Sequence, residues 1–398
     1  MNLKPNTKIK LDHLGQFYAA INSEHHPGTF SISAQLKDTI VPATLQQAVN
    51  DLLQRLPFMN VRSKRGFMWH YHEVLATPPK IVSEKDFPAL CSPFKKDNNH
   101  LIRIIYGNRS ITLEVLHTVC DGRSLAMVAS SLLARYFELL GEEINKEGLI
   151  DCNETMHMEE AEDAYARYAD LRKSRSESSV KDVYIPKYQP TATRMITYKI
   201  NLAQIKARAK SHGFTISEYI VVHICSEFAK QRTRENCTHG ITVNVPIDCR
   251  GLFPSKSLRN FVSHKTITIP KSLGFTEMGL DIKKQFAEIT PDYIQTKISE
   301  IEKLMRIGKY LPLLVKNQII KKIGEHESAS YTTGFSNLGL LKLPREIQDK
   351  IETYAFTLGP EPTMPYQFAC VTVGDTLTLT ATTTARDNEI IDRIFNVL

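Results

Sequence analysis

A densely charged segment divides two stretches that each mix strand and helix patterns, and this division constrains the fold more than any other feature. Between residues 151 and 190 apolar positions thin out, serines cluster and prolines follow. This composition is typical of an exposed helix that leads into an extended linker. A chain of 398 residues is long enough for two cores. We therefore predict a first domain at 1–175, a linker at 176–192 and a second domain at 193–398.

Both flanking stretches carry the hydrophobic periods of strands and helices. In the first stretch, helix patterns cover 44–56 and 123–140, and a Gly-Asn pair at 107–108 separates two apolar strand patterns, which predicts a hairpin. In the second stretch, the patterns predict strands at 192–200, 239–250, 331–339 and 376–385 and helices at 201–213, 215–233 and 275–289. Mixed elements in both halves predict an α/β (α+β) fold of two sandwiches.

The composition narrows the class of protein. Hydrophobic residues make up 42% of the chain and charged residues 23%, as in globular proteins. No run approaches the roughly 20 apolar residues of a membrane span, and the first residues lack a signal-peptide pattern, so we expect a cytoplasmic protein without a membrane span. The net charge of +7 is not interleaved with aromatic residues, which argues against a nucleic-acid partner. A solvated basic surface and a phosphate-bearing substrate remain the two explanations of this charge.

The cysteines and histidines predict neither a disulfide framework nor a metal site. The seven cysteines are odd in number, scattered and never spaced C-x-x-C. Cys120 is interpreted mainly as a packing residue, because a nucleophilic thiol needs a base placed to activate it and a small apolar residue could do the same packing. His26, His70, His72 and His264 form no set at metal spacing.

One histidine stands at a predicted junction between a strand and a helix, in the stretch ITLEVLHTVCDGRS. Alternation along the strand puts His117 on its inner face, at its end. Asp121 and Gly122 follow, where a helix cap and a tight turn are expected. His117 is therefore either a hydrogen-bonded core histidine or a general base, a role that suits an imidazole pKa near about 6.5.

The segment HTVCDGRS resembles the H-x-x-x-D-G signature of the CoA-dependent acyltransferase superfamily. This superfamily includes chloramphenicol acetyltransferase, alcohol acetyltransferases, plant BAHD acyltransferases and condensation domains of peptide synthetases. Four further segments are similar to parts of these proteins and extend the resemblance over nearly the whole chain: LDHLGQFYAAIN, HGFTISEYIVVHIC, VNVPIDCRGLFPSKSLRNFVS and GFSNLGLLKLP. Leu116 stands where condensation domains usually carry a first histidine, and the plant-type D-F-G-W-G motif has no counterpart. Both departures favour the alcohol acetyltransferase branch.

The resemblance implies two chloramphenicol acetyltransferase-like α/β sandwich domains with an active-site tunnel between them. His117 would remove the proton from the acceptor as it attacks the thioester carbonyl, without a covalent intermediate. Asp121 would turn away from the tunnel and pair with Arg250 to hold the loop, with Arg123 as a local competitor. Gly122 completes the motif.

Further site residues follow from the same resemblance. Ser336 and Asn337 would donate to the oxyanion, or Asn337 would instead form a turn. Lys256 and Arg259 would bind the phosphates of CoA, or would be exposed cations of a loop. Asn260 could fix the backbone of that loop.

The function that the resemblance implies is transfer of an acyl group from acyl-CoA, such as acetyl-CoA, to the hydroxyl of an alcohol. In one alternative the donor is a carrier-protein thioester or the acceptor is an amine, as in free-standing condensation domains. In another, the protein binds ligands without turnover. No resident cofactor or metal is expected, acyl-CoA is a co-substrate, and a monomer is expected because two domains can supply both halves of the site.

Overall fold

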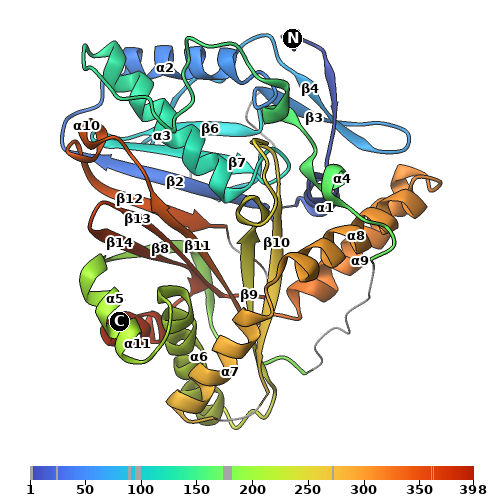
Figure 1. The fold of residues 1–398 in the computed structure, drawn as a ribbon, viewed down its shortest axis with the longest axis vertical. Coiled ribbons are helices and arrows are strands. Elements are labelled where there is room, and N and C mark those ends of the chain that lie inside the picture. Colours follow the sequence, from blue (N-terminus) through green and yellow to red (C-terminus); the bar gives the residue numbers. More distant parts are fainter. Residues whose placement is uncertain are drawn as a thin grey trace.

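The computed structural model describes residues 3–23, 26–87, 91–94, 100–173, 182–270, 273–359, 361 and 363–398. Within these residues the strands form sheets of five, six and three strands (Figure 1). The two larger sheets belong to the two halves of the molecule, and each is covered by helices.

The five-stranded sheet has the order β12-β2-β7-β6-β5. Its strands are β2 (Thr29–Leu36), β5 (Val82–Ser83), β6 (Ile102–Tyr106), β7 (Ser110–Leu116) and β12 (Ile351–Leu358). β6 and β7 form the antiparallel hairpin that the Gly-Asn pair predicts. Helices α2 (Pro42–Arg55) and α3 (Gly122–Leu139) pack on one face of this sheet (Figure 1).

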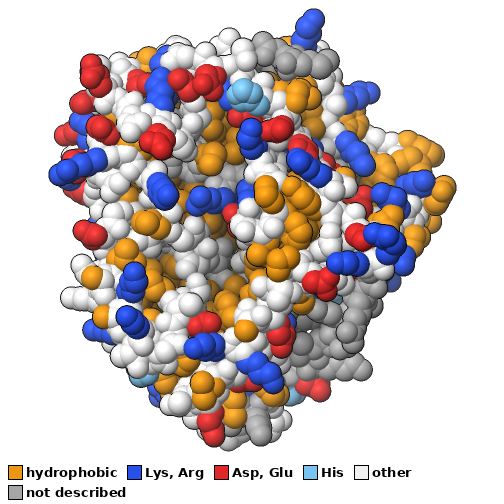
Figure 2. Space-filling view, viewed as in Figure 1, with side chains coloured by type: hydrophobic (Ala, Val, Ile, Leu, Met, Phe, Trp, Pro, Cys, Tyr) orange, Lys and Arg blue, Asp and Glu red, His pale blue; other side chains and the backbone are white. Residues whose placement is uncertain are grey.

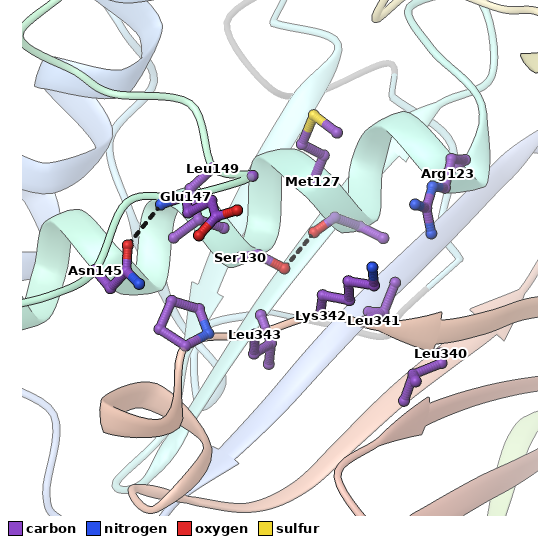
Figure 3. Close-up of a pocket in the computed structure, with 13 residues that line it drawn as sticks. Arg123, Met127, Ser130, Asn145, Glu147, Leu149, Leu340, Leu341, Lys342 and Leu343 are labelled. Atoms are coloured by element: carbon purple, nitrogen blue, oxygen red, sulfur yellow. Dashed lines mark hydrogen bonds between the residues drawn. The ribbon is translucent and has the colours of Figure 1, made fainter.

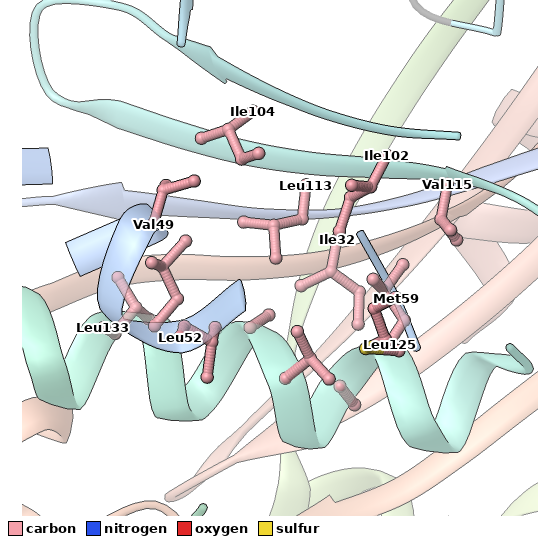
Figure 4. Packing of buried hydrophobic residues seen from close by; sticks show 14 of the residues in the cluster. Ile32, Val49, Leu52, Met59, Ile102, Ile104, Leu113, Val115, Leu125 and Leu133 are labelled. Carbon is pink, nitrogen blue, oxygen red and sulfur yellow. The ribbon is translucent and has the colours of Figure 1, made fainter. Parts of the chain in front are cut away.

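The core of this half fills the space between the sheet and its two helices (Figure 4). Ile32 of β2, Leu113 of β7 and Leu125 of α3 are each at most 3% exposed. Burial of each such side chain stabilises the fold by about 1.5–3 kcal/mol. The end of β7 and the beginning of α3 are therefore held firmly, and the loop that joins them carries His117.

The six-stranded sheet has the order β10-β9-β11-β13-β14-β8. Its strands are β8 (Pro190–Asn201), β9 (Ile241–Asp248), β10 (Val262–Ile269), β11 (Thr333–Leu341), β13 (Tyr366–Val373) and β14 (Thr376–Ala385). Four helices lie on the side away from the first sheet (Figure 1): α5 (Leu202–Ser211), α6 (Ile216–Arg234), α7 (Phe275–Ala287) and α11 (Glu389–Val397). Thr215 and Glu218 cap the first turn of α6 reciprocally, which explains where this helix begins.

The chain crosses between the two larger sheets after β11. β12 pairs antiparallel with β2 in the first sheet, and the next strand, β13, returns to the second sheet beside β11. The predicted second domain at 193–398 would include residues 351–358, whereas β12 lies in the first sheet. The division at 176–192 itself stays a prediction. The crossing residues bring Phe356 beside the beginning of α3.

The charged segment is partly buried, contrary to the exposed helix predicted there. It holds the short helices η1 (Met158–Ala161) and α4 (Ala164–Tyr168), and Tyr165 is 1% exposed because it packs against Phe261. The serine cluster lies outside the described residues.

The remaining elements lie outside the two larger sheets. They are the three-stranded sheet of β1 (Lys8–Lys10), β4 (His70–Val74) and β3 (Val61–Arg65), helix α1 (His13–Ile21), the helix pair α8 (Pro291–Gly308) and α9 (Leu313–Ser328), and the short η2 (Cys249–Gly251) and α10 (Arg345–Gln348). The α8–α9 pair projects from the body of the molecule (Figure 1). Among the described residues, no helix is both long and apolar enough to cross a membrane.

Candidate active site

His117 directly follows β7 and lines a cavity between the two halves. Its backbone N–H donates to the carbonyl of Gly28 over 2.8 Å. Its imidazole stacks on the ring of Tyr18, with centroids 4.4 Å apart and an interplanar angle of 7°. The ring of Phe30 meets it edge-on at 4.7 Å. Two aromatic rings and a backbone hydrogen bond therefore fix the position of this histidine.

Asn260 determines which imidazole nitrogen of His117 carries the proton. The Asn260 Nδ2 donates to the His117 carbonyl over 3.0 Å and to Asp12 Oδ1 over 3.2 Å. The amide oxygen of Asn260 therefore faces His117 Nδ1, 3.2 Å away, and can only accept from it. Nδ1 carries the hydrogen, and Nε2 keeps its lone pair. Among the described residues, no side chain forms a hydrogen bond with Nε2.

The environment of His117 favours the neutral imidazole. Burial lowers the pKa of His117 below its ordinary value of 6.5, while the carboxylate of Asp121 acts in the opposite direction. Burial disfavours the charged form because the protein interior solvates a charge less well than water does. A histidine that is neutral at physiological pH, with Nε2 unprotonated, can accept a proton from a bound acceptor.

Asp121 caps α3 and has both carboxylate oxygens occupied. Its Oδ1 accepts from Ser124 N over 2.9 Å, and its Oδ2 accepts from Phe261 N over 2.8 Å and from Arg250 Nη1 over 2.9 Å. The side chain of Asp121 is 4% exposed. This carboxylate therefore ties the loop after His117 to the beginning of α3 and to the segments that carry Arg250 and Phe261.

Arg250 connects the beginning of α3 to the loop that carries Asn260. Besides Asp121, its guanidinium donates to Ser124 Oγ, to Asp248 Oδ1 and to the carbonyls of Ser257 and Arg259, over 2.7–3.0 Å. The structure thus brings Arg250 to Asp121, the pairing that the resemblance implies. Arg123, the local competitor, makes no such pair.

Gly122 is needed for close packing at the first turn of α3. A Cβ at this position would lie 3.0 Å from Phe356 Cζ and 3.1 Å from Leu338 Cδ2. Both distances are shorter than ordinary carbon contacts. The glycine therefore lets β12 and β11 approach the helix at the floor of the His117 cavity.

Ser336 and Asn337 both line the cavity, but their polar groups differ in availability. Ser336 is 7% exposed, and its hydroxyl has no hydrogen bond within the described part of the chain. Asn337 donates to Ser217 Oγ over 2.9 Å and accepts from Gly339 N over 2.7 Å. Gly339 has a φ of +71°, so Asn337 forms the turn that the sequence left as an alternative.

Lys256 and Arg259 do not form a phosphate site, so this prediction is wrong for Arg259. Arg259 is 7% exposed, and its guanidinium donates to Asp12 Oδ2 over 3.2 Å and to the Lys10 carbonyl over 2.8 Å. Its charge is therefore already paired inside the protein. The side chain of Lys256 is 77% exposed and pairs with Glu159 at 3.0 Å. Lys256 is an exposed cation of its loop.

The cavity at His117 has a volume of about 220 Å³ and adjoins two others. A cavity of about 480 Å³ lies beneath α8 and α9. It shares with the His117 cavity the residues Leu14, Tyr18, Asn244, Val262, Ser263 and His264. A hollow of about 670 Å³ lies between α3 and the end of β11, and Arg123 borders both this hollow and the His117 cavity (Figure 3). His117 therefore stands between an apolar cavity and an open hollow that holds Arg123 and Lys342.

Several residues of the site were missed by sequence reasoning. Asp12 caps α1, and Tyr18 lies within this helix. Both belong to the segment that resembles the family's first helix, and this resemblance was the only available signal. Their spacing does not reveal that they contact residues about a hundred or more positions away. Sequence reasoning considered His72 as a metal ligand and excluded that role, without placing it in the site. It is 3% exposed and its Nε2 lies 3.2 Å from Thr118 Oγ1, so it supports the His117 loop.

No group of three or more metal-ligating side chains gathers within the described ranges.

Comparison with known proteins identifies the fold. No family model and no curated protein sequence matches the chain. Polyketide synthase associated protein 5 from Mycobacterium tuberculosis matches with a TM-score of 0.65 and 14% identity, over 99% of this chain and 98% of that chain. The condensation domain of the Monacolin K polyketide synthase matches with a TM-score of 0.64 and 11% identity, over 99% and 97%. The epimerization domain from the third module of tyrocidine synthetase B matches with a TM-score of 0.62 and 11% identity, over 100% and 95%.

Each match covers both halves of this molecule and nearly the whole length of the matched chain. The predicted fold class is confirmed: over its full length the chain has the α/β fold of two subdomains that condensation domains share.

Proposed function

We propose that this protein is a condensation-type acyltransferase, which moves an acyl group from a phosphopantetheine thioester to a hydroxyl or an amine. One observation carries the proposal: His117 lines the cavity between the halves with Nδ1 held by Asn260 and Nε2 left unprotonated. The lowered pKa of His117 keeps this nitrogen unprotonated at neutral pH. A packed core histidine would instead have both nitrogens satisfied by the protein.

The proposed reaction needs no covalent intermediate on the protein. The acceptor oxygen or nitrogen attacks the thioester carbonyl carbon while His117 Nε2 takes its proton. The tetrahedral intermediate collapses, the carbon–sulfur bond breaks, and the imidazolium returns the proton to the leaving thiolate. The free hydroxyl of Ser336, buried in the same cavity, supports a role as donor to the oxyanion.

Two observations favour a carrier-protein thioester over acyl-CoA as the donor. Arg259 is paired internally, so one of the two cations expected at the adenosine phosphates of CoA is not available to them. The solved neighbours are named as parts of peptide and polyketide synthases or as associated with them. In the open hollow, Arg123 and Lys342 offer two cations to the single phosphate of a phosphopantetheine arm (Figure 3). Acyl-CoA remains the second candidate donor, since it carries the same phosphopantetheine arm.

The cavity beneath α8 and α9 favours a long aliphatic group on one of the two substrates. Most of its surface is apolar, with Ile298, Ile301, Met305 and Ile320 in the lining, and it adjoins the His117 cavity at Tyr18. A volume of about 480 Å³ accommodates a chain of many methylenes. Each methylene that leaves water there contributes about 0.8 kcal/mol to binding.

The test compares three donors that carry the same octanoyl group: a phosphopantetheinylated acyl carrier protein, CoA and plain pantetheine. Decanol and decylamine serve as acceptors, and the ester or amide is measured by mass spectrometry. We expect acceptor-dependent product that disappears in His117→Ala and persists in His239→Ala, which alters an exposed histidine. Removing both cations, Arg123→Ala with Lys342→Ala, should raise KM for the carrier and CoA donors and leave octanoyl-pantetheine unaffected.

The outcomes separate the candidates. A higher kcat/KM with the carrier than with CoA supports the proposal, and the reverse order selects the acyl-CoA candidate. If no donor gives product with either acceptor, or if His117→Ala retains full activity, the proposed function is wrong.

A further inference from the structure

The helix pair α8–α9 is anchored at its base and unpartnered at its tip. Ile294 and Ile298 of α8 are buried against the body of the protein. At the base of α9, a Cβ on Gly324 would lie 3.0 Å from Ile21 of α1, so the two helices pack closely. Residues 303–322, which comprise the end of α8, the connection and the first part of α9, lie beyond this contact and project outward (Figure 1).

This tip exposes an unusual amount of apolar surface. Large apolar side chains on α8–α9 are exposed by 37–77% of their area: Leu304, Ile307, Tyr310, Leu311, Leu314, Val315, Ile319 and Ile323. Phe67, 83% exposed, joins them from the turn between β3 and β4, because its carbonyl accepts from Leu313 N over 3.1 Å. Monomeric proteins rarely expose a contiguous apolar patch of this kind unless it binds something.

The charge of the tip is of one sign. Residues 303–322 contain six lysines and arginines and no aspartate or glutamate. Lys303, Arg306, Lys309, Lys321 and Lys322 are exposed, whereas Lys316 is buried over the ring of Trp69. Figure 2 shows apolar and basic side chains mixed over this projection. An apolar patch surrounded by cations is the pattern of a segment that lies at the interface of an anionic bilayer.

We propose that the α8–α9 tip, residues 303–322 together with Phe67, docks on an anionic lipid membrane. A second copy of this chain fits the surface poorly, since it would bring five further exposed cations against the first five. The phosphate groups of anionic lipids match the cations, and the acyl region beneath them takes the apolar side chains.

Docking would also connect the bilayer to the cavity system. Leu304, Ile307 and Ile319 belong both to the exposed tip and to the lining of the apolar cavity that adjoins His117. A lipid substrate could therefore pass between α8 and α9 without crossing water. This consequence rests on the proposed function, whereas the docking itself does not.

The test is flotation of the purified protein with vesicles, without any substrate. Vesicles of phosphatidylcholine alone are compared with vesicles that also contain phosphatidylglycerol. We expect binding to the anionic vesicles that decreases with salt. Lys321→Glu with Lys322→Glu should weaken it at least about 25-fold, about fivefold for each cation. The matched control, Lys206→Glu with Lys210→Glu on α5, reverses two exposed cations far from the tip and should bind normally.

The apolar contribution has its own pair of variants. Leu314→Ser removes a side chain that is 77% exposed at the tip, and Leu280→Ser removes one that is 60% exposed on α7. Only the first should weaken binding. Trp69 is the single tryptophan and borders the cavity at the tip, so its emission should shift to shorter wavelength when anionic vesicles are added.

Three results would overturn the docking proposal. One is absence of binding to either kind of vesicle, and another is equal loss in the tip and control variants. The third is a protein dimer in solution that Leu314→Ser dissociates, without vesicle binding, which would make the tip a protein interface. Because no reaction is measured, none of these results depends on the acyl-transfer activity.

Discussion

Replacing Arg250 by alanine should destabilise the fold strongly, because this arginine neutralises a buried carboxylate. Asp121 has a side chain that is 4% exposed and sits 2.9 Å from the Arg250 guanidinium. Removal of one partner of a buried ion pair costs about 3–5 kcal/mol, since the other charge stays buried and unpaired. Asp121 keeps its bonds to the amides of Ser124 and Phe261, so we expect the lower end, about 3 kcal/mol.

The assay is urea unfolding followed by circular dichroism. The control is Arg234→Ala, which breaks the ion pair between Arg234 and Glu389. The side chain of Arg234 is 56% exposed and that of Glu389 is 61% exposed. An exposed pair contributes only about 0–1 kcal/mol. Arg250→Lys keeps the charge but loses the bonds of the planar guanidinium, so it should fall between alanine and wild type. If Arg250→Ala loses no more stability than the Arg234 control, the argument that Arg250 holds the His117 loop is wrong.

Three further predictions follow from the same contacts. Gly122→Ala should lower stability by roughly 1–2 kcal/mol, measured by urea unfolding, because its Cβ would crowd Phe356 and Leu338, and an unchanged midpoint would contradict this packing. The acid limb of kcat/KM should have its midpoint below pH 6.5, because burial lowers the pKa of His117, and a midpoint above 6.5 would contradict the neutral base. Burial lowers the pKa of His72 from 6.5 to about 3. Between these two pH values the unfolded state binds one more proton than the folded state, so the free energy of unfolding decreases as the pH falls. His72→Gln should make that decrease shallower by about 1.4 kcal/mol per pH unit, and an unchanged slope in unfolding experiments across pH would refute the assignment.

Local patterns predicted much of the fold. The Gly-Asn turn predicted the β6–β7 hairpin, and the apolar stripe of residues 123–140 predicted α3, because both signals depend on neighbours in sequence. The crossing of β12 into the first sheet was not predictable in this way. Its pairing with β2 depends on residues about 320 positions away, and no short-range pattern encodes such a partner.

The site was predicted unevenly for the same reason. His117 and Asp121 lie within one local motif, so their roles could be stated from spacing and resemblance. Asn260 and Arg259 are adjacent in one loop, yet one bonds to the imidazole and the other pairs with Asp12 inside the protein. Both side chains are buried, and sequence alone does not tell which partner each of two neighbouring polar residues meets there, since that depends on the elements packed against them.

The mixed charge and apolarity of residues 303–322 were visible in the sequence but were not distinguished from ordinary surface. The apolar positions there resemble those of a helix that packs on a core. Only the three-dimensional arrangement shows that the base of the helix pair packs and the tip does not.

The central claim is that His117 Nε2 removes a proton from the acceptor during acyl transfer. The most direct measurement is acceptor-dependent release of free thiol from octanoyl-pantetheine by the wild-type protein and by His117→Ala, since this donor needs no carrier recognition. The account predicts release that requires the acceptor and falls between about 100-fold and 10,000-fold in the variant. Release that is equal in the two proteins would contradict it.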